Sequence, residues 1–329
     1  MSELKLSVIL PTRNPHPERL NRVLAGLRQQ TLAPSQWEFW VIDNGSEPPL
    51  HATAFADFPV SVRILPERRP GLFWARLTGL QAAAGQFIVF LDDDTVPAPG
   101  SLASIVRFME ANAKLGTAGG RIEAEYLRPP PPWIGEVEWA LALRNWGDQP
   151  RVWQAGDTVT LPNWTPIGAG LVVRRTAVPD YLEHARRWSD AIIARSWHGQ
   201  GSGGNEDKDL VLCLLRAGWA TGYCPEHRLT HLIPESRLSL RYFEQLLPVL
   251  GELWERTLYA YRWEFEAPIH PATQSLRACK AWWTMRAWRG PAERLRWLSK
   301  RGSYAGRARN YRERFRYPAG SYTPLPAPC

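Results

Sequence analysis

The feature that most constrains this chain is an apolar run that ends in three consecutive carboxylates. Residues 87–91 read as a buried strand, and Asp92, Asp93 and Asp94 follow directly. In an extended chain successive side chains alternate between two faces, so Asp92 and Asp94 are predicted to point the same way and Asp93 the other. Neighbouring carboxylates repel unless a cation lies between them, and a hard divalent ion is the natural partner. A solvated acidic turn explains the same residues, because Asp is common in turns.

Strand and helix patterns alternate through the N-terminal third of the sequence. The apolar, β-branched runs that predict strands lie at 4–10, 37–42, 60–65 and 87–91. Apolar residues at helical spacing lie at 20–27 and 73–84, and Pro11 is expected to end the first strand. Strands that alternate with helices in this way predict βαβ units and a parallel sheet.

Polar residues follow the first, second and fourth of these strands. A parallel sheet binds its ligand outside the carboxyl ends of the strands, so these residues are expected to share one edge. They are Thr12, Arg13, Asn14, Asp43, Asn44, Asp92 and Asp94. The sequence therefore predicts a ligand site at this edge of the sheet.

The pattern becomes less regular later in the chain. Residues 126–153 contain four consecutive prolines and several tryptophans, which favours an irregular, partly extended segment. Residues 165–175 read as a strand entered through small residues. Glu206 and Asp207 begin a helical pattern that Gly218 is expected to end.

The basic residues are concentrated near the C-terminus. The 329 residues carry a net charge of +8, but from residue 271 onward 13 Lys and Arg stand against 2 Asp and Glu. The body before that point is therefore slightly acidic, which disfavours a nucleic-acid-binding protein. No apolar run reaches the ~18 residues of a membrane span, and the N-terminus has no signal-peptide pattern. The four cysteines do not have the spacing of metal ligands, which favours a reducing, cytoplasmic location. They are Cys213, Cys224, Cys279 and Cys329.

Taken in order, several of these pieces resemble motifs of the inverting family 2 glycosyltransferases. The segments that carry the resemblance are Val8–Asn14, Val41–Ser46, Gly71–Gly79, Asp92–Asp94 and Gly203–Asp207. In the family they correspond to two nucleotide-binding strand ends, a G-x-x-x-A-R-N-x-G segment, the DxD metal motif and the Glu-Asp motif of the catalytic base. Leu77 stands where the family has Asn, so contacts of that side chain do not carry over.

The resemblance implies an α/β fold of the GT-A type. A Rossmann-like, mainly parallel sheet flanked by helices would be followed by a helical C-terminal extension. The glycosyltransferase domain would span residues 1–240, with a nucleotide-sugar half at about 1–125 and an acceptor half at about 126–240. Residues 241–329 would form the basic, Trp-rich, mainly helical extension.

The resemblance also implies which side chains would hold the donor. The residues expected to contact it are Pro11, Thr12, Arg13, Asn14, Asp43, Arg76, Asp92 and Asp93. Asp43 would meet the base and Arg76 a phosphate, although a turn-forming Asp and a surface Arg explain these two residues as well. Mn²⁺ or Mg²⁺ would be held by Asp94 and Asp92, and it would act on the departing diphosphate as a Lewis acid. His231 would be a third metal ligand or a structural histidine.

On the acceptor side, Asp207 would take the proton from the attacking hydroxyl, with Glu206 orienting the acceptor or the backbone. A predicted helix start favours an ionised carboxylate at Asp207. The same position favours a capping Asp without any catalysis. A single displacement would invert the anomeric centre.

The expected activity is transfer from a nucleoside-diphosphate sugar, with UDP as the expected nucleotide, to a hydroxyl of a saccharide or lipid-linked acceptor in cell-surface polysaccharide assembly. A sugar nucleotidyltransferase would want a glycine-rich loop after the first strand, and Pro11–Pro15 contains no Gly. A saccharide-binding or membrane-recruited scaffold that lost turnover is the non-enzymatic alternative. The donor sugar, acceptor and oligomeric state are left open by the sequence.

Tryptophans distinguish two further segments. The first segment contains five tryptophans, and one or two of them are expected to line an acceptor groove. The five are Trp133, Trp139, Trp146, Trp153 and Trp164. In residues 271–329, Trp alternates with Arg and Lys. A helical cap is the first interpretation of this segment, and peripheral contact with an anionic membrane at the inner face of the cell membrane is the second.

Overall fold

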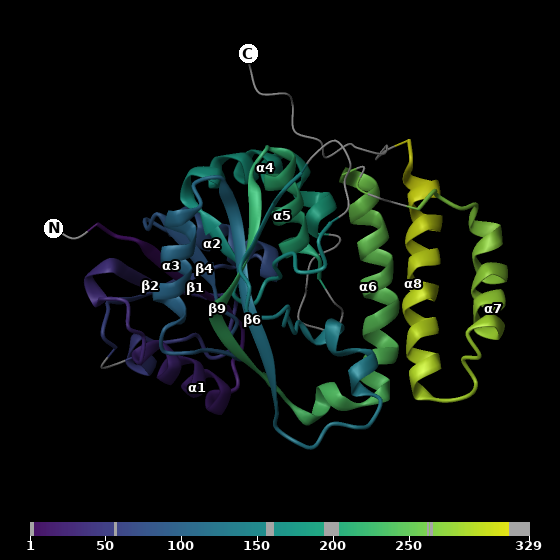
Figure 1. Cartoon of the computed structure of the whole chain (residues 1–329), viewed down its shortest axis with the longest axis horizontal. Coiled ribbons are helices and arrows are strands. Elements are labelled where there is room, and N and C mark those ends of the chain that lie inside the picture. The colour runs from purple at the N-terminus through teal and green to yellow at the C-terminus, as the bar shows by residue number, and fades with distance from the viewer. Residues whose placement is uncertain are drawn as a thin grey trace, which may run out of the picture.

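The first four predicted strands lie parallel to one another in one mixed sheet (Figure 1). The computed structural model describes residues 3–55, 58–155, 161–193, 204–261, 263 and 266–315. Within them β1 (Leu6–Thr12), β2 (Trp37–Asp43), β3 (Val62–Pro66) and β4 (Phe87–Phe90) lie in the order β3-β2-β1-β4, and all three neighbouring pairs are parallel. The helices α1 (Pro17–Arg28) and α2 (Leu72–Ala82) connect these strands at the predicted places.

The prediction that Pro11 ends the first strand was wrong. β1 continues through Pro11 to Thr12, paired with β2 as far as Asp43. On its other side, β1 pairs with β4 only as far as Ile9. Pro11 therefore lies where one edge of the strand is open, and a residue without a backbone N–H is tolerated at such a position.

The second half of the sheet is joined through a short antiparallel strand. β8 (Val172–Arg174) lies antiparallel between β4 and β6 (Leu115–Tyr126), and β6 pairs in parallel with β9 (Ala220–Ile233). β5 (Thr95–Pro97) and β7 (Arg151–Gln154) add antiparallel to β9. Only the last part of the 165–175 segment is therefore strand. The predicted α/β class is confirmed, with a mixed rather than purely parallel sheet.

Helices cover both faces of the sheet. The apolar side chains of α1 and α3 (Ser101–Ala111) pack on one face, and those of α2, α4 (Val178–Ile193) and α5 (Glu206–Arg216) pack on the other. Gly218, just beyond α5, has φ of +91°, which Gly adopts readily. The three layers bring the end of β4 and the start of α5 to the same region of the molecule.

Three long helices follow the sheet and stand side by side in Figure 1. They are α6 (Leu240–Tyr261), α7 (Gln274–Thr284) and α8 (Pro291–Glu313). A Cβ on Gly302 of α8 would lie 2.1 Å from the Pro248 carbonyl oxygen of α6, so this approach requires glycine. Ser303 donates a buried hydrogen bond of 2.6 Å to Glu255 across the same interface. α8 thus fixes α6 in place.

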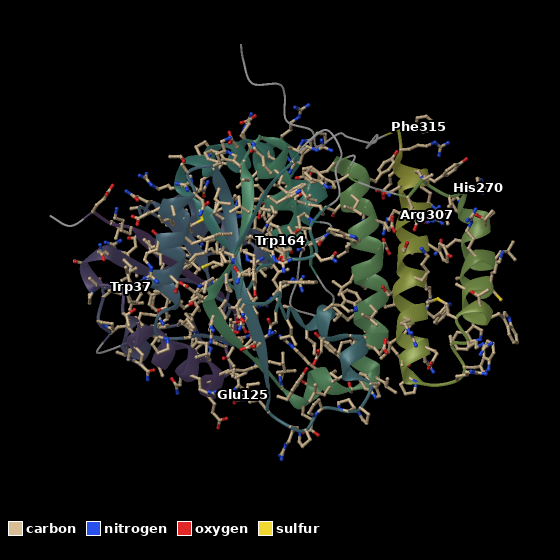
Figure 2. All side chains as sticks on the ribbon, viewed as in Figure 1. Trp37, Glu125, Trp164, His270, Arg307 and Phe315 are labelled. Atoms are coloured by element: carbon tan, nitrogen blue, oxygen red, sulfur yellow. The ribbon has the colours of Figure 1, made fainter. Side chains whose placement is uncertain are left out.

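The link between α6 and α7 is also tied to α8. The Arg307 Nε donates a hydrogen bond of 2.8 Å to the Ala267 carbonyl, and Figure 2 shows Arg307 on α8 beside the helix that begins after His270. The predicted helical extension is confirmed over α6 to α8, and residues 316–329 lie outside the described part of the chain. None of the described helices is long and apolar enough to cross a membrane.

The segment predicted to be irregular, residues 126–153, contains the end of β6, short 3₁₀ turns at Ile134–Glu136 and Glu138–Leu141, and the start of β7. The turns pack against α6 and α8 in a third apolar cluster. This packing makes α6 and the 134–141 turns into two neighbouring walls of one cavity.

Candidate active site

A cavity of about 1030 Å³ opens where the carboxyl edge of the sheet faces the start of α5 and the side of α6. Its volume is at the upper end of the range for small-molecule sites. Most of the predicted site residues line it, from the ends of β1, β4 and β9, from α2 and from the first turn of α5. They are Pro11, Thr12, Arg13, Asn14, Arg76, Asp92, Asp93, Asp94, Glu206, Asp207 and His231.

The three consecutive carboxylates lie in a turn. β4 ends at Phe90, and the Thr95 N–H donates to the Asp92 carbonyl at 3.1 Å. This i to i+3 bond ends the extended backbone, so the predicted alternation of faces was wrong. All three carboxylates line the cavity, each with a different partner. Thr12 Oγ1 donates to Asp93, whose pKa is raised to about 6 by burial and by the charge of Asp94.

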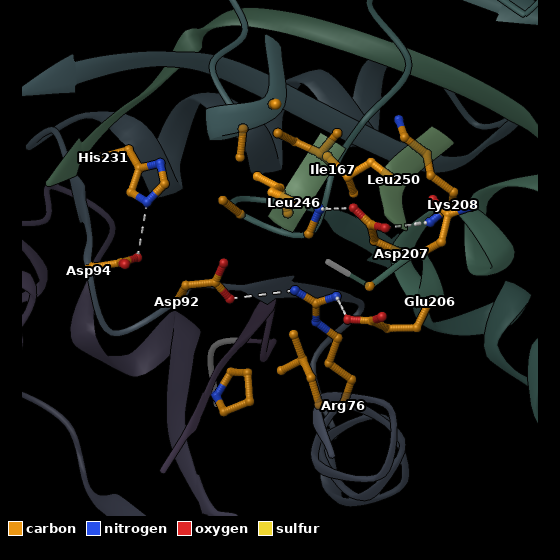
Figure 3. A pocket seen from close by; sticks show the side chains of 18 of the residues that line it. Arg76, Asp92, Asp94, Ile167, Glu206, Asp207, Lys208, His231, Leu246 and Leu250 are labelled. Atoms are coloured by element: carbon orange, nitrogen blue, oxygen red, sulfur yellow. Dashed lines mark hydrogen bonds and ion pairs between the residues drawn. The ribbon is translucent and has the colours of Figure 1, made fainter. Parts of the chain in front are cut away.

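Asp94 faces His231 in Figure 3, and it also lies beside Arg237. Its carboxylate oxygens lie 3.4 Å from His231 Nε2 and 3.3 Å from the Arg237 guanidinium. Burial alone would raise the pKa of Asp94, but attraction to His231 and Arg237 keeps it below its ordinary value. Asp94 is therefore ionised at neutral pH.

The hydrogen bonds of His231 fix which ring nitrogen can accept. Nδ1 lies 2.9 Å from the Leu141 carbonyl oxygen, which can only accept, so Nδ1 carries the proton. In the neutral ring Nε2 is then an acceptor, and Arg237 lies 3.1 Å from it. A charged His231 would attract Asp94 through an Nε2–H donor, whereas a neutral His231 would present Nε2 beside Asp94 as a second acceptor for the Arg237 guanidinium.

This donor pair is chemically suited to a divalent cation. A metal-ligating His commonly donates its other N–H to a backbone carbonyl, as His231 does here, and carboxylate oxygens suit Mn²⁺ and Mg²⁺. Among the described residues no group of three or more His, Cys, Asp or Glu side chains is arranged to hold a metal. A cation at Asp94 and His231 would therefore replace the Arg237 guanidinium and take further ligands from a substrate.

Arg76 bridges the two sides of the cavity. Its guanidinium lies 3.5 Å from Asp92 and 3.2 Å from Glu206, and its side chain is only 7% exposed. Burial raises the pKa of Asp92, and the Arg76 charge opposes that rise. A Cβ on Gly168 would lie 2.1 Å from the guanidinium, so the loop before β8 packs directly on it. The alternative of a surface Arg is wrong, whereas the predicted phosphate contact stays a prediction.

Asp207 lies in the first turn of α5, as the sequence predicted. One carboxylate oxygen accepts from the Gly168 backbone N–H at 2.7 Å, and the other accepts from the Lys208 backbone N–H at 2.8 Å (Figure 3). The N-cap residue Asn205 makes no side-chain capping bond. Two backbone donors therefore fix the orientation of the carboxylate, and the side chain borders the cavity. Gly203, part of the predicted motif, lies outside the described residues.

The edge formed by β1 and β2 is held by its own side chains. Both oxygens of Asp43 accept backbone N–H groups, from Ser46 at 2.8 Å and from Leu50 at 3.0 Å. Burial would raise the pKa of Asp43, and these bonds lower it below its ordinary value. Asp43 is not among the lining residues, so the structure favours its turn-forming role; the contact with a donor base stays a prediction. Asn14 has φ of +49° and accepts from the Glu47 N–H.

The sequence analysis missed three cations and most of one wall. Arg237 follows His231 by six positions, a local signal that was available, and Lys208 is the immediate neighbour of Asp207. Arg144 belongs to no sequence motif that would have indicated a role. The apolar wall comes from α6 through Tyr242, Leu246, Leu250 and Trp254, and of the five candidate tryptophans Trp139 lines the cavity.

A comparison with protein-family models identifies the family of the N-terminal half of the chain. Residues 7–170 match the model of the family described as glycosyl transferase family 2. The chain contains a glycosyl transferase family 2 domain. The match includes the aspartates after β4 and confirms the resemblance; Asp207 and His231 lie beyond the matched residues.

Several curated relatives of this chain are named N-acetylglucosaminyltransferase. One from Mesorhizobium japonicum is 24% identical over 265 residues, covering 78% of this chain and 58% of the relative. One from Sinorhizobium fredii is 26% identical, with 78% and 59% covered. The chain thus spans little more than half the length of these relatives. Among solved structures, the crystal structure of S. aureus TarS 1-349 aligns with a TM-score of 0.47 and 13% identity, covering 94% of this chain and 91% of that one.

Proposed function

We propose that this protein transfers a sugar from a nucleoside-diphosphate sugar to an acceptor hydroxyl, with inversion at the anomeric carbon. The observation that supports the proposal is the cavity, because the aspartates after β4 and Asp207 all line it. The family 2 domain supports glycosyl transfer as the reaction. The names of the curated relatives support N-acetylglucosamine as the sugar, and the proposed carrier is UDP.

Asp207 acts as the general base in this proposal. It accepts the proton of the acceptor hydroxyl as that oxygen attacks the anomeric carbon. The Gly168 and Lys208 N–H groups hold the carboxylate in a fixed orientation, with lone pairs left for the acceptor. Glu206 orients Arg76, and Arg76 in turn positions Asp92.

The departing diphosphate needs positive charge. Asp94 and His231 would hold Mn²⁺ or Mg²⁺, which supplies Lewis-acid stabilisation of the leaving group when bound. Arg237 lies at the same point and, once displaced from Asp94, is placed to contact a phosphate oxygen. Thr12, Arg13 and Asn14 at the end of β1 border the donor side of the cavity.

The acceptor is a saccharide or a lipid-linked saccharide of cell-surface polysaccharide assembly. A membrane-bound acceptor is favoured by a surface patch on α7 and the turn after it. Leu276, Trp283 and Trp288 are 72%, 63% and 50% exposed there. Exposed basic residues surround them, namely Arg277, Lys280, Arg286 and Arg289. Apolar and basic groups together suit the surface of an anionic membrane. Trp282 and Trp297 instead pack against each other, as the cap interpretation requires.

A thermal-shift panel tests the donor site. UDP, GDP, dTDP, CDP and ADP are each added with and without Mn²⁺. Metal-dependent stabilisation by UDP, lost in Asp94→Asn and kept in the distant control Arg175→Gln, is expected. No stabilisation by any diphosphate would contradict the proposal and favour the scaffold alternative, which flotation with vesicles containing anionic lipid would then test.

A further inference from the structure

Two cations that the family motifs do not include border the same cavity near Asp207. Arg144 is held at a fixed point by a backbone bridge, in which its N–H and carbonyl pair with Ile122 of β6 at 2.9 and 2.7 Å. Lys208 follows Asp207 on α5, and the contact that Figure 3 draws from it to that carboxylate is made by its backbone N–H. Both side chains are therefore positioned by secondary structure rather than by a surface loop.

Carbonyl oxygens are the hydrogen-bond partners of both side chains among the described residues. Lys208 Nζ donates to the carbonyls of Pro166 at 2.9 Å and Thr165 at 3.4 Å. Arg144 Nη1 donates to the Leu143 carbonyl at 2.7 Å. The Arg144 Nε is inaccessible to solvent and has no hydrogen-bond partner in this part of the chain. Nη1 makes the one side-chain hydrogen bond of this guanidinium to the described residues, which leaves donor capacity on a side chain that lines the cavity.

The charges near these two cations do not balance. Burial and the neighbouring Arg144 charge lower the pKa of Lys208 to about 7, while Asp207 opposes that change. Asp207 is also the one carboxylate whose charge acts on Arg144. Two cations therefore lie near one described carboxylate. The excess positive charge costs free energy, and a bound anion would recover part of it.

This excess positive charge is separate from the cations near the DxD aspartates. The charge of Arg237 interacts with Asp92, Asp93 and Asp94, whereas none of these three acts on Arg144 or Lys208. A diphosphate held at Asp94 would therefore leave Asp207 as the counter-ion that Arg144 and Lys208 share. The pair lies beside the candidate base, where the proposed function places the acceptor.

We propose that Arg144 and Lys208 form a subsite for an oxyanion carried by the acceptor, either a phosphate ester or the carboxylate of a uronic acid. The inference rests on the proposed function for its assignment to the acceptor. A planar guanidinium with free N–H groups can bind either oxyanion through paired hydrogen bonds, and the ammonium adds a point charge. The subsite selects an acceptor with negative charge near the reacting hydroxyl. Leu246 and Leu250 of α6 supply an apolar surface next to it.

Matched pairs of small probes test the subsite on the intact protein. Methyl β-D-glucuronide is compared with methyl β-D-glucoside, and glycerol 3-phosphate with glycerol, by calorimetry at constant ionic strength. The nucleoside diphosphate and Mn²⁺ identified by the donor panel fill the donor site. Variants are Arg144→Gln, Lys208→Gln and, as a control outside the cavity, Arg175→Gln. Thermal unfolding without probe confirms that each variant is folded.

We expect at least one charged probe to bind about tenfold or more tightly than its neutral match, with the preference lost in Arg144→Gln and Lys208→Gln and kept in Arg175→Gln. Preference for glycerol 3-phosphate assigns a phosphate ester, and preference for the glucuronide assigns a uronic acid. Equal binding of charged and neutral probes, or unchanged preference in both cavity variants, would overturn the inference. If the donor panel alone fails, the probes are titrated without nucleotide, and binding at the subsite can still be interpreted.

Discussion

The Arg76 bridge gives the most quantitative prediction about the candidate site. Arg76→Met keeps the length of the side chain and removes the guanidinium that faces Asp92 and Glu206. Glu206 is 5% exposed and Asp92 31%, so most of the effect comes from Glu206. Removing one partner of a buried ion pair costs about 3–5 kcal/mol, and partial exposure of Asp92 places the expected loss near about 3 kcal/mol.

A double-mutant cycle separates the ion pair from side-chain packing. In the double variant Arg76→Met with Glu206→Gln, the second substitution removes the carboxylate charge that the first one left without its guanidinium partner. The two substitutions together should therefore cost less than the sum of the single effects, by about 1–3 kcal/mol. Urea unfolding followed by circular dichroism measures each free energy of unfolding, and an unchanged m-value shows that the same structure unfolds.

A surface pair supplies the control. Arg22 and Glu125 lie closer together, at 2.6 Å, but both side chains are more than 40% exposed, and Figure 2 shows Glu125 at the margin of the molecule. Arg22→Met should cost less than about 1 kcal/mol because solvent screens the pair. Strict additivity in the Arg76 cycle, or an equal loss in Arg22→Met, would refute burial as the reason for the strength of the Arg76 bridge.

Three further predictions concern the surroundings of the site. Gly168→Ala places a Cβ 2.1 Å from the Arg76 guanidinium, so we expect a loss of about 1–3 kcal/mol in urea unfolding; a similar loss in the Arg76→Met background would contradict this explanation. Arg237→Gln should tighten Mn²⁺ binding at Asp94 without nucleotide, measured by electron paramagnetic resonance, and weaker binding would show that Arg237 does not compete. His227 is fully buried and its pKa is lowered from 6.5 to about 4. Its contribution to stability is complete above pH 6.5 and should fall by about 3 kcal/mol as the pH drops to 4, whereas His227→Gln should flatten that part of the profile.

The parts of the site that could be predicted are adjacent in the sequence. The end of β4 was visible because an apolar strand stops at Asp92, which is a matter of local periodicity that a single sequence records. Asp207 was singled out because Gly203–Asp207 resembles a family motif, and the helical pattern after it only indicated a helix start. The parallel order of the first strands follows from the same alternation.

The parts that were missed depend on tertiary packing. Arg144 reaches the cavity through a single backbone bridge to β6, and no local pattern marks such a bridge. The α6 wall requires α8 behind it, with Gly302 allowing the close approach. The turn at Asp92 replaced a predicted extended segment because one hydrogen bond from Thr95 ends the strand early. A sequence contains these residues without showing which of them meet.

The central claim is that Asp207 is the base for glycosyl transfer within this cavity. The most direct measurement is the rate of UDP release from UDP-N-acetylglucosamine, with Mn²⁺ and the charged probe that binds best, in the wild type and in Asp207→Asn. We expect a rate lower by about 10²–10⁴-fold in the variant, with UDP affinity unchanged within about twofold, since Asp207 lies apart from the proposed diphosphate site. A variant that releases UDP as fast as the wild type would contradict the account.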